Sequence, residues 1–179
     1  GIVTHGHGDH FDGNLINNIC TDDSIVVVPN SLKDKIASGK IWTISPGEKR
    51  VTDDGILVRA TVAYNVKRFR SSGEPYHPRE LGLGYVIEVD EKKVYDAGDT
   101  DLIPEMEELP ELDAALLPSG GTYTMDMNEA AEAAFLIQPK VAIPMHLRGA
   151  DPQAFKNDVE NKSSTTVVIL EEGEEYKLE

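Results

Sequence analysis

The chain has 179 residues, of which 40% are hydrophobic and 27% charged, with a formal net charge of −15 and a single cysteine, Cys20. This composition is typical of a soluble globular protein and excludes a disulfide within the chain, and no apolar run approaches the roughly 20 residues that span a bilayer. The negative charge disfavours general nucleic-acid binding, and we interpret most of it as a solvated surface.

The first half of the chain alternates short apolar runs with turn signals. Residues 2–4 indicate the end of a strand, and a short helix is expected at 14–20. A buried strand at 24–28 precedes a helix at 31–38, which Ser31 should cap. Closely spaced strands at 41–44, 49–52 and 56–63 predict an antiparallel meander, and a polar surface loop follows at 66–80.

The second half alternates more regularly. We expect a hairpin at 84–89 and 93–95, strands at 114–117 and 141–144, helices at 102–108, 127–137 and 152–161, and a closing strand pair at 165–170 and 175–178. This order predicts a single α+β sandwich domain over residues 1–179. The chain opens on GIVT without an initiator Met, so we expect that the domain is N-terminally incomplete.

Residues 4–10, THGHGDH, concentrate metal-binding side chains directly after a predicted strand. His5, His7, Asp9 and His10 offer imidazole and carboxylate groups, the usual ligands of zinc and similar divalent ions. The intervening glycines allow a tight backbone that aims these side chains at one point. The pattern therefore indicates metal ligands, with a structural histidine cluster as the weaker alternative.

This motif resembles the signature of the metallo-β-lactamase superfamily, whose fold is a four-layer αββα sandwich with the metals at one edge. Members begin with strands before the motif, and those strands are lacking here. The resemblance implies that His5 and His7 bind one metal, whereas Asp9 and His10 bind a second.

Three later motifs complete the ligand set that the resemblance implies. Asp99, in the segment YDAGDT at 95–100, would bridge both metals, and its neighbour Asp96 is expected to be a turn or supporting residue. His146 follows the strand at 141–144, and His77 lies about twenty residues before the bridging aspartate. All five histidines of the chain are then used as ligands.

Secondary motifs resemble the branch related to ascorbate-6-phosphate lactonase: AYN at 63–65, HP at 77–78, GGTYTM at 120–125 and IPMH at 143–146. From these motifs and the residues beside them we expect five substrate-binding residues: Arg148, Tyr64, Asn65, Tyr123 and Thr124. A basic cluster occupies the predicted loop, namely Lys67, Arg68, Arg70 and Arg79. It is interpreted either as a clamp for a substrate anion or, preferably, as a solvated surface.

The expected function is that of a metal-dependent hydrolase that uses a metal-bridged hydroxide to cleave a small-molecule ester, lactone or phosphoester, with Asp9 as proton acceptor. Two divalent ions are expected, zinc or manganese, with iron as a further option. The alternatives are a metallo-β-lactamase-type nuclease and a non-catalytic metal-binding scaffold. We expect a cytoplasmic protein with a small-molecule substrate, for which an anion is one option, and with no nucleic-acid or membrane partner; a homo-oligomer is left open.

Overall fold

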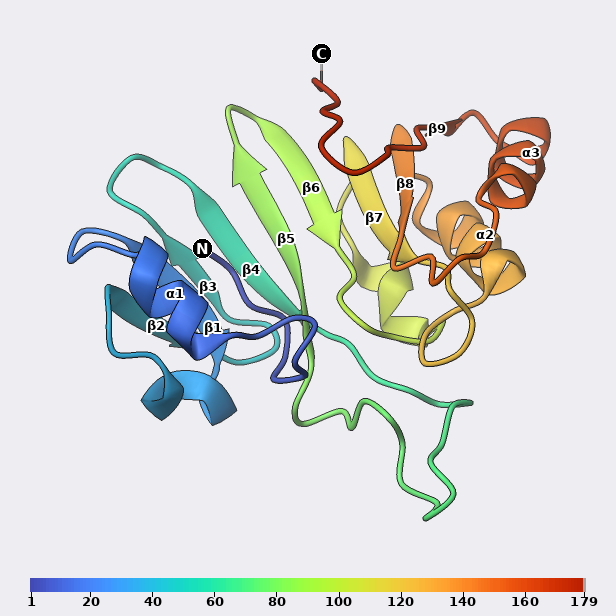
Figure 1. Cartoon of the computed structure of the whole chain (residues 1–179). Coiled ribbons are helices and arrows are strands. Elements are labelled where there is room, and N and C mark those ends of the chain that lie inside the picture. Colours follow the sequence, from blue (N-terminus) through green and yellow to red (C-terminus); the bar gives the residue numbers. More distant parts are fainter. Residues whose placement is uncertain (179) are drawn as a thin grey trace.

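Two β-sheets lie face to face between two layers of helices in the computed structural model, which describes residues 1–178 (Figure 1). Three clusters of buried apolar side chains separate these layers. The middle cluster joins the sheets, since it contains Val27 and Ile44 from the small sheet and Val58 and Tyr85 from the large one. The four-layer αββα sandwich predicted from the sequence is thereby confirmed.

The small sheet consists of β1 (Ile25–Pro29) and β2 (Lys40–Ile44), which run parallel. The helix α1 (Gly13–Ile19) and the 3₁₀ turn η1 (Asn30–Lys35) belong to this half of the molecule. Successive side chains of a strand point to opposite faces, so Val26 and Val28 pack toward the helical side while Val27 packs toward the large sheet.

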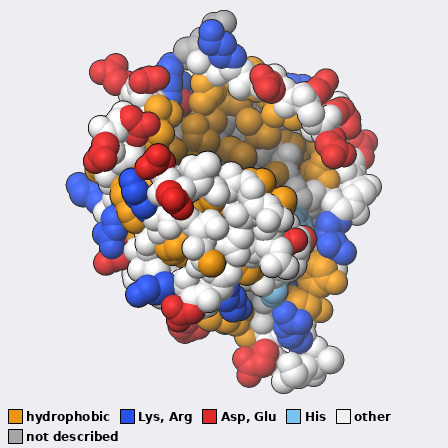
Figure 2. Space-filling model, turned by 60° about the vertical axis from the view of Figure 1, so that its left-hand side comes forward, with side chains coloured by type: hydrophobic (Ala, Val, Ile, Leu, Met, Phe, Trp, Pro, Cys, Tyr) orange, Lys and Arg blue, Asp and Glu red, His pale blue; other side chains and the backbone are white. Residues whose placement is uncertain are grey.

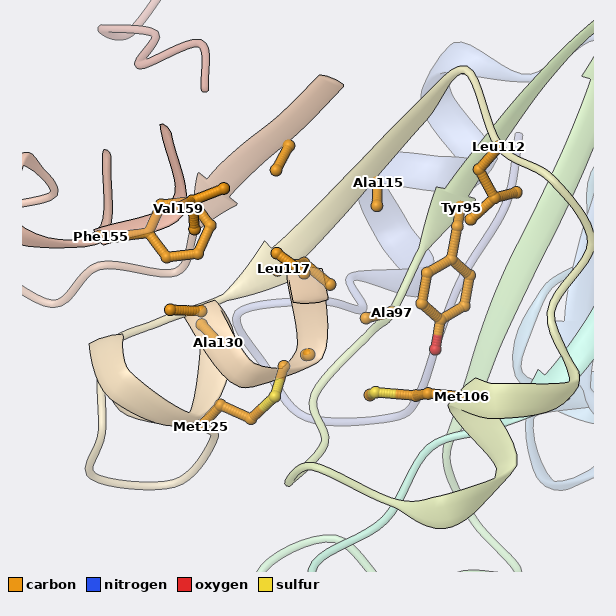
Figure 3. Close-up of a cluster of buried hydrophobic side chains, with 14 of the residues drawn as sticks. Tyr95, Ala97, Met106, Leu112, Ala115, Leu117, Met125, Ala130, Phe155 and Val159 are labelled. Carbon is orange, nitrogen blue, oxygen red and sulfur yellow. The ribbon is translucent and has the colours of Figure 1, made fainter. Parts of the chain in front are cut away.

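The large sheet has its strands in chain order, antiparallel from β3 to β6 and parallel from β6 to β9. Its strands are β3 (Lys49–Val51), β4 (Leu57–Val62), β5 (Leu83–Val89), β6 (Lys92–Asp96), β7 (Ala114–Pro118), β8 (Val141–Met145) and β9 (Thr166–Val167). Its outer face is covered by η2 (Pro104–Glu108), α2 (Met127–Ile137) and α3 (Gln153–Lys162). Figure 3 shows the core beneath them, including Leu117, Met125 and Phe155.

The segments that carry the predicted metal ligands meet at one edge of the large sheet. The strands β4, β6, β7 and β8 all end at this edge, and β5 begins there, because β5 alone of these strands runs in the opposite direction (Figure 1). The N-terminal segment crosses between the sheets at the same place. The backbone N–H of Val3 donates to Val27 of β1, and the carbonyl of Thr4 accepts from Leu83 of β5. The residues after Thr4 are therefore delivered to the edge where the strands end.

Four sequence predictions need correction. The segment at 31–38 forms only the short turn η1 without a side-chain cap from Ser31, because Ile36 is extended and the backbone N–H groups of residues 37 and 38 donate to the Asn17 side chain instead of to the preceding turn. The meander fails because β2 pairs with β1 rather than with β3. The segment at 102–108 is a 3₁₀ turn opened by Pro104. The closing pair is absent within residues 1–178: β9 pairs with β8, and the glutamate-rich stretch at 171–178 forms no strand.

The remaining two properties concern membrane-spanning helices and the exposure of the histidines. No helix within residues 1–178 is long and apolar enough to cross a membrane. Figure 2 shows a face of the molecule with a hollow lined by hydrophobic side chains, and histidine side chains visible lower down between Lys and Arg side chains. The metal-binding residue types are thus accessible from outside.

Candidate metal centre

The seven predicted ligands gather at the edge where the parallel strands end. The side-chain donor atoms of His5, His7 and His77 lie within 4.8 Å of one another. The same limit holds for a second group, formed by Asp9, His10 and His146. These two groups correspond to the two metal sites that the sequence resemblance implied, although their residues come from three separate segments of the chain.

The Asp99 carboxylate lies between the two groups. Its Oδ2 atom is 3.2 Å from Nε2 of His77 and 3.6 Å from Nε2 of His146. Its Oδ1 atom is 3.4 Å from Nε2 of His10. A left-handed turn at Gly98 (φ +60°) directs this aspartate inward, and Asp96 accepts the Gly98 N–H, so Asp96 is the turn residue that the sequence predicted. A carboxylate in this position can reach a cation on either side.

Partners on the far ring nitrogens orient three of the imidazoles. The Thr4 hydroxyl lies 3.1 Å from Nδ1 of His5 and 3.3 Å from Nδ1 of His10. The Asn65 side chain accepts from both the backbone N–H and Nδ1 of His77, at 2.8 and 2.9 Å. Hydrogen bonds at Nδ1 leave Nε2 of these rings facing the centre, which is the arrangement that metal-binding histidines usually have.

Burial sets the charge state of the cluster. Burial, followed by the neighbouring His10 ring, lowers the pKa of His5 to about 3, and burial also lowers the pKa of His7. For Asp99, burial raises the pKa of the carboxyl, but contact with His77 and the charges of His10 and His146 outweigh it and leave the pKa below its usual value. At neutral pH the imidazoles of His5 and His7 are therefore uncharged and the Asp99 carboxylate is ionised, as metal binding requires.

A cavity of about 220 Å³ opens onto the cluster. It is lined by His7, Asp9, Arg70, Tyr76, His77, Asp99 and Tyr123. A more apolar hollow of about 300 Å³ adjoins His5, His7 and His77 on another side, with Leu32 and Leu81 among its lining residues. The cluster is therefore reachable by a small molecule.

Of the five predicted substrate-binding residues, two lie at or beside the cavity and three do not. Tyr123 lines the cavity, and the Arg148 guanidinium lies 4.7 Å from the centroid of its ring. Asn65 is buried and fully engaged, since it also donates to the Tyr123 carbonyl, so it supports His77 instead of facing a substrate. Tyr64 donates to a carboxylate outside the cavity, and Thr124 is completely buried. None of these three side chains lines the cavity, and their contact with a substrate stays a prediction.

The basic loop is mostly neutralised by carboxylates. Lys67 pairs with Glu129 at 2.8 Å, and Arg79 contacts Glu105 at 2.6 Å. Arg68 donates to Asp101 at 2.7 Å and also pairs with Glu129. The preferred interpretation as a solvated surface fits Lys67 and Arg79, which are exposed although paired, but fails for Arg68, whose side chain is only 13% exposed. The ion pairs of these three side chains tie the loop to η2 and α2. Arg70, the fourth member, instead lines the cavity.

Sequence reasoning missed two residues of this region, Thr4 and Tyr76, and left Arg70 between a clamp for a substrate anion and a solvated surface. Thr4 had a usable signal, because ligand histidines need a partner for their second nitrogen and Thr4 directly precedes His5. Tyr76 had none, because its proximity to the cluster depends on how the loop at 66–80 folds back, and the same fold decides which interpretation of Arg70 holds.

Comparison with known proteins supports this geometry. A model of the Beta-lactamase superfamily domain matches residues 2–147. A UPF0173 metal-dependent hydrolase of Pelotomaculum thermopropionicum is 35% identical over 187 residues, which cover 99% of this chain and 81% of that protein. A relative from Pyrococcus abyssi is 33% identical over 189 residues, covering 99% of this chain and 80% of its own length. The chain belongs to the UPF0173 metal-dependent hydrolase family of the metallo-β-lactamase superfamily.

Solved structures agree with this assignment. A crystal structure from Parabacteroides distasonis superposes on this UPF0173 chain with a TM-score of 0.84 and 33% identity, covering 94% of this chain and 74% of the other. Igni18, described as a metallo hydrolase of Ignicoccus hospitalis, gives a TM-score of 0.78 at 31% identity, with 98% and 79% covered. The metallo-β-lactamase fold and the metal-dependent hydrolase class are thus established for the family, whereas the substrate is not.

Proposed function

We propose that this UPF0173 chain hydrolyses a small-molecule ester, lactone or phosphoester with two divalent cations held at the edge of the sandwich. One cation would be held by His5, His7 and His77, and the other by Asp9, His10 and His146, with Asp99 shared between them. The observation that carries the proposal is the arrangement of the donor atoms. His5, His7 and His77 lie together, as do Asp9, His10 and His146, and Asp99 groups with His5 and His10 between them.

The donors are suited to metal ions in a further respect. Nε2 of His77 and Oδ1 of Asp99 are buried and make no hydrogen bond within residues 1–178. Buried polar atoms without partners are costly, so their persistence here needs a reason. A cation coordinated by these atoms supplies that reason. Imidazole and carboxylate donors suit zinc or manganese, with iron as a third option.

Bound divalent cations of this kind acidify a coordinated water and polarise the electrophilic oxygen of a substrate. The chain itself contributes a proton acceptor. The Asp9 side chain is 59% exposed and lines the cavity. Burial raises its pKa, but a hydrogen bond from its own backbone N–H and the charge of His10 outweigh this effect, so the pKa lies below its usual value. Asp9 is therefore ionised at neutral pH and able to take a proton at its carboxylate.

The cavity of about 220 Å³ favours a small substrate over a polymer. The net charge of −15 and the neutralisation of most of the basic loop also disfavour a nucleic-acid substrate. The resemblance of the secondary motifs to the ascorbate-6-phosphate lactonase branch supports a lactone as one of the bonds to be tested.

The test combines metal content with turnover. The chain, its His7→Ala and His146→Ala variants, and the distant control Asp113→Asn are analysed for metal per chain and assayed on a panel of ester, lactone and phosphoester substrates. We expect two equivalents of metal in the unmodified chain and the control, one or fewer in each histidine variant, and turnover that falls with the metal. Unchanged metal in the histidine variants refutes the ligand scheme. Full metal without turnover on any panel member favours the non-catalytic scaffold instead.

A further inference from the structure

Four side chains form a continuous row beside the mouth of the metal centre. The Arg70 guanidinium lies 4.9 Å from the ring centroid of Tyr76, and the Tyr76 and Tyr123 rings meet edge to face with centroids 4.6 Å apart. Arg148 then lies over Tyr123 at 4.7 Å. The row is assembled from three loops, which follow β4, β7 and β8. We call it the arginine–tyrosine row.

The row borders the candidate metal centre directly. Arg70, Tyr76 and Tyr123 line the same cavity as His7, Asp9, His77 and Asp99. Tyr76 immediately precedes His77, and Arg148 follows His146 by two residues. A molecule placed with its reacting bond at the metal centre would therefore have its other end against the row.

The two arginines of the row differ from the other basic side chains of this region. Lys67, Arg68 and Arg79 each contact a carboxylate within 4 Å. Within residues 1–178, neither Arg70 nor Arg148 forms such an ion pair, and both side chains are exposed. One Arg70 N–H donates to the Tyr76 carbonyl at 3.5 Å. A guanidinium that lies over a ring presents its other in-plane N–H donors at the spacing of carboxylate or phosphate oxygens.

The backbone also holds Arg148 in an unusual way. Both His146 and Arg148 have φ of +51°, a left-handed conformation that residues other than glycine rarely adopt. Such conformations concentrate where a side chain must be aimed for function. The loop after β8 thus presents its imidazole to the metal centre and its guanidinium to Tyr123.

We propose that Arg70 and Arg148, each positioned by a tyrosine ring, form a subsite for an oxyanion, so that the substrate carries a carboxylate or a phosphate close to the bond that is cleaved. The inference rests on the proposed function for the meaning of "substrate", but the subsite can be tested by binding alone. It also explains why an acidic protein keeps two unpaired arginines at this mouth.

Two non-hydrolysable probes test the subsite. Phenylphosphonate and benzoate are titrated into the metal-loaded chain by calorimetry, with phenol as the uncharged control. The variants are Arg70→Gln and Arg148→Gln, and the matched control is Arg79→Gln, because Arg79 is also stacked on a tyrosine (Tyr64) but pairs with Glu105 away from the cavity. Metal content and the thermal midpoint are measured for every variant.

We expect each glutamine variant of the row to weaken binding of at least one anion by roughly 10-fold or more, the usual effect of losing a charge-assisted hydrogen bond. Phenol binding should not change, and Arg79→Gln should bind both anions like the unmodified chain. The anion that loses more affinity identifies the chemistry, phosphate or carboxylate. If a glutamine variant folds poorly, Arg70→Lys and Arg148→Lys take its place and should show a smaller but measurable loss.

The proposal is overturned if the row variants keep their metal and bind both anions as tightly as the unmodified chain, or if the unmodified chain binds neither anion at millimolar concentration. Equal weakening by Arg79→Gln would also overturn it, because the effect would then be one of general charge. A chain that binds anions through the row but hydrolyses nothing would leave the subsite standing while removing the proposed function.

Discussion

Replacing Asn65 should show how much metal binding depends on the orientation of His77, because the histidine itself is retained. Oδ1 of Asn65 accepts from two N–H groups of His77, and Nδ2 donates to the Tyr123 carbonyl at 2.9 Å. Because the backbone N–H can only donate, the atom facing His77 is the amide oxygen, and Nδ1 of His77 must carry a proton. In the neutral ring, a proton on Nδ1 leaves Nε2 as the nitrogen that can bind a metal.

The magnitude follows from what Asn65→Leu leaves behind. Two N–H donors of His77 become unpaired in a buried site, since His77 is only 4% exposed. Each unpaired buried donor costs about 1–3 kcal/mol, so the metal-free variant should lose about 2–6 kcal/mol of unfolding free energy. Metal affinity should fall by roughly 10- to 100-fold, because the ring loses its fixed orientation and tautomer.

Urea unfolding of the metal-free protein measures the first quantity, and competition with a chelator measures the second. Asn128→Leu is the control, because Asn128 is exposed on α2, and surface changes of this kind alter stability by less than about 0.5 kcal/mol. Asn65→Asp keeps the oxygen that accepts from both N–H groups of His77 and should retain most of the metal affinity. If Asn65→Leu loses stability but binds metal as tightly as the unmodified chain, the orienting role assigned to Asn65 is wrong.

Three further outcomes are expected. The unfolded chain binds a proton at His5 below pH 6.5, whereas the folded chain does not until about pH 3. The metal-free protein should therefore be most stable above pH 6.5 and lose about 1.4 kcal/mol per pH unit from this group below it, as measured by urea unfolding against His5→Gln. Arg68→Ala should cost about 3–5 kcal/mol in thermal or urea unfolding, because Asp101 is completely buried and would lose its charged partner. Thr4→Val removes the hydroxyl beside His5 and His10 with little change of shape, and chelator competition should show roughly 10-fold weaker metal binding.

For each of these three predictions, one result would contradict the reasoning. Stability that does not change between neutral pH and pH 5, or that falls equally in His5→Gln, would contradict the lowered pKa of His5. An Arg68→Ala variant as stable as the unmodified chain would mean that water replaces the guanidinium beside Asp101. Unchanged metal affinity in Thr4→Val would show that its hydroxyl does not orient the imidazoles.

The sequence alone was sufficient for the layers of the fold and for the gathering of the histidines. The helix at 127–137 matched α2 at both ends, because an alanine-rich apolar stripe at helical spacing has one stable placement, against the sheet. His5, His7, Asp9 and His10 are close in sequence, so a tight loop brings them together wherever it lies. The family resemblance then led to His77, Asp99 and His146, which the structure places beside them.

What the tertiary structure decided were the partners of individual side chains and strands. Local pattern could not indicate that β2 pairs with β1, since strand periodicity identifies a strand but not its neighbour. It also could not distinguish Asn65, which supports His77, from Tyr123, which lines the cavity. Nor could local pattern show that Arg70 lines the cavity while the other three basic side chains of its loop pair with carboxylates. Hydrogen bonds and ion pairs between residues distant in sequence form only once the loops have folded over the sheet edge, so no local signal encodes them.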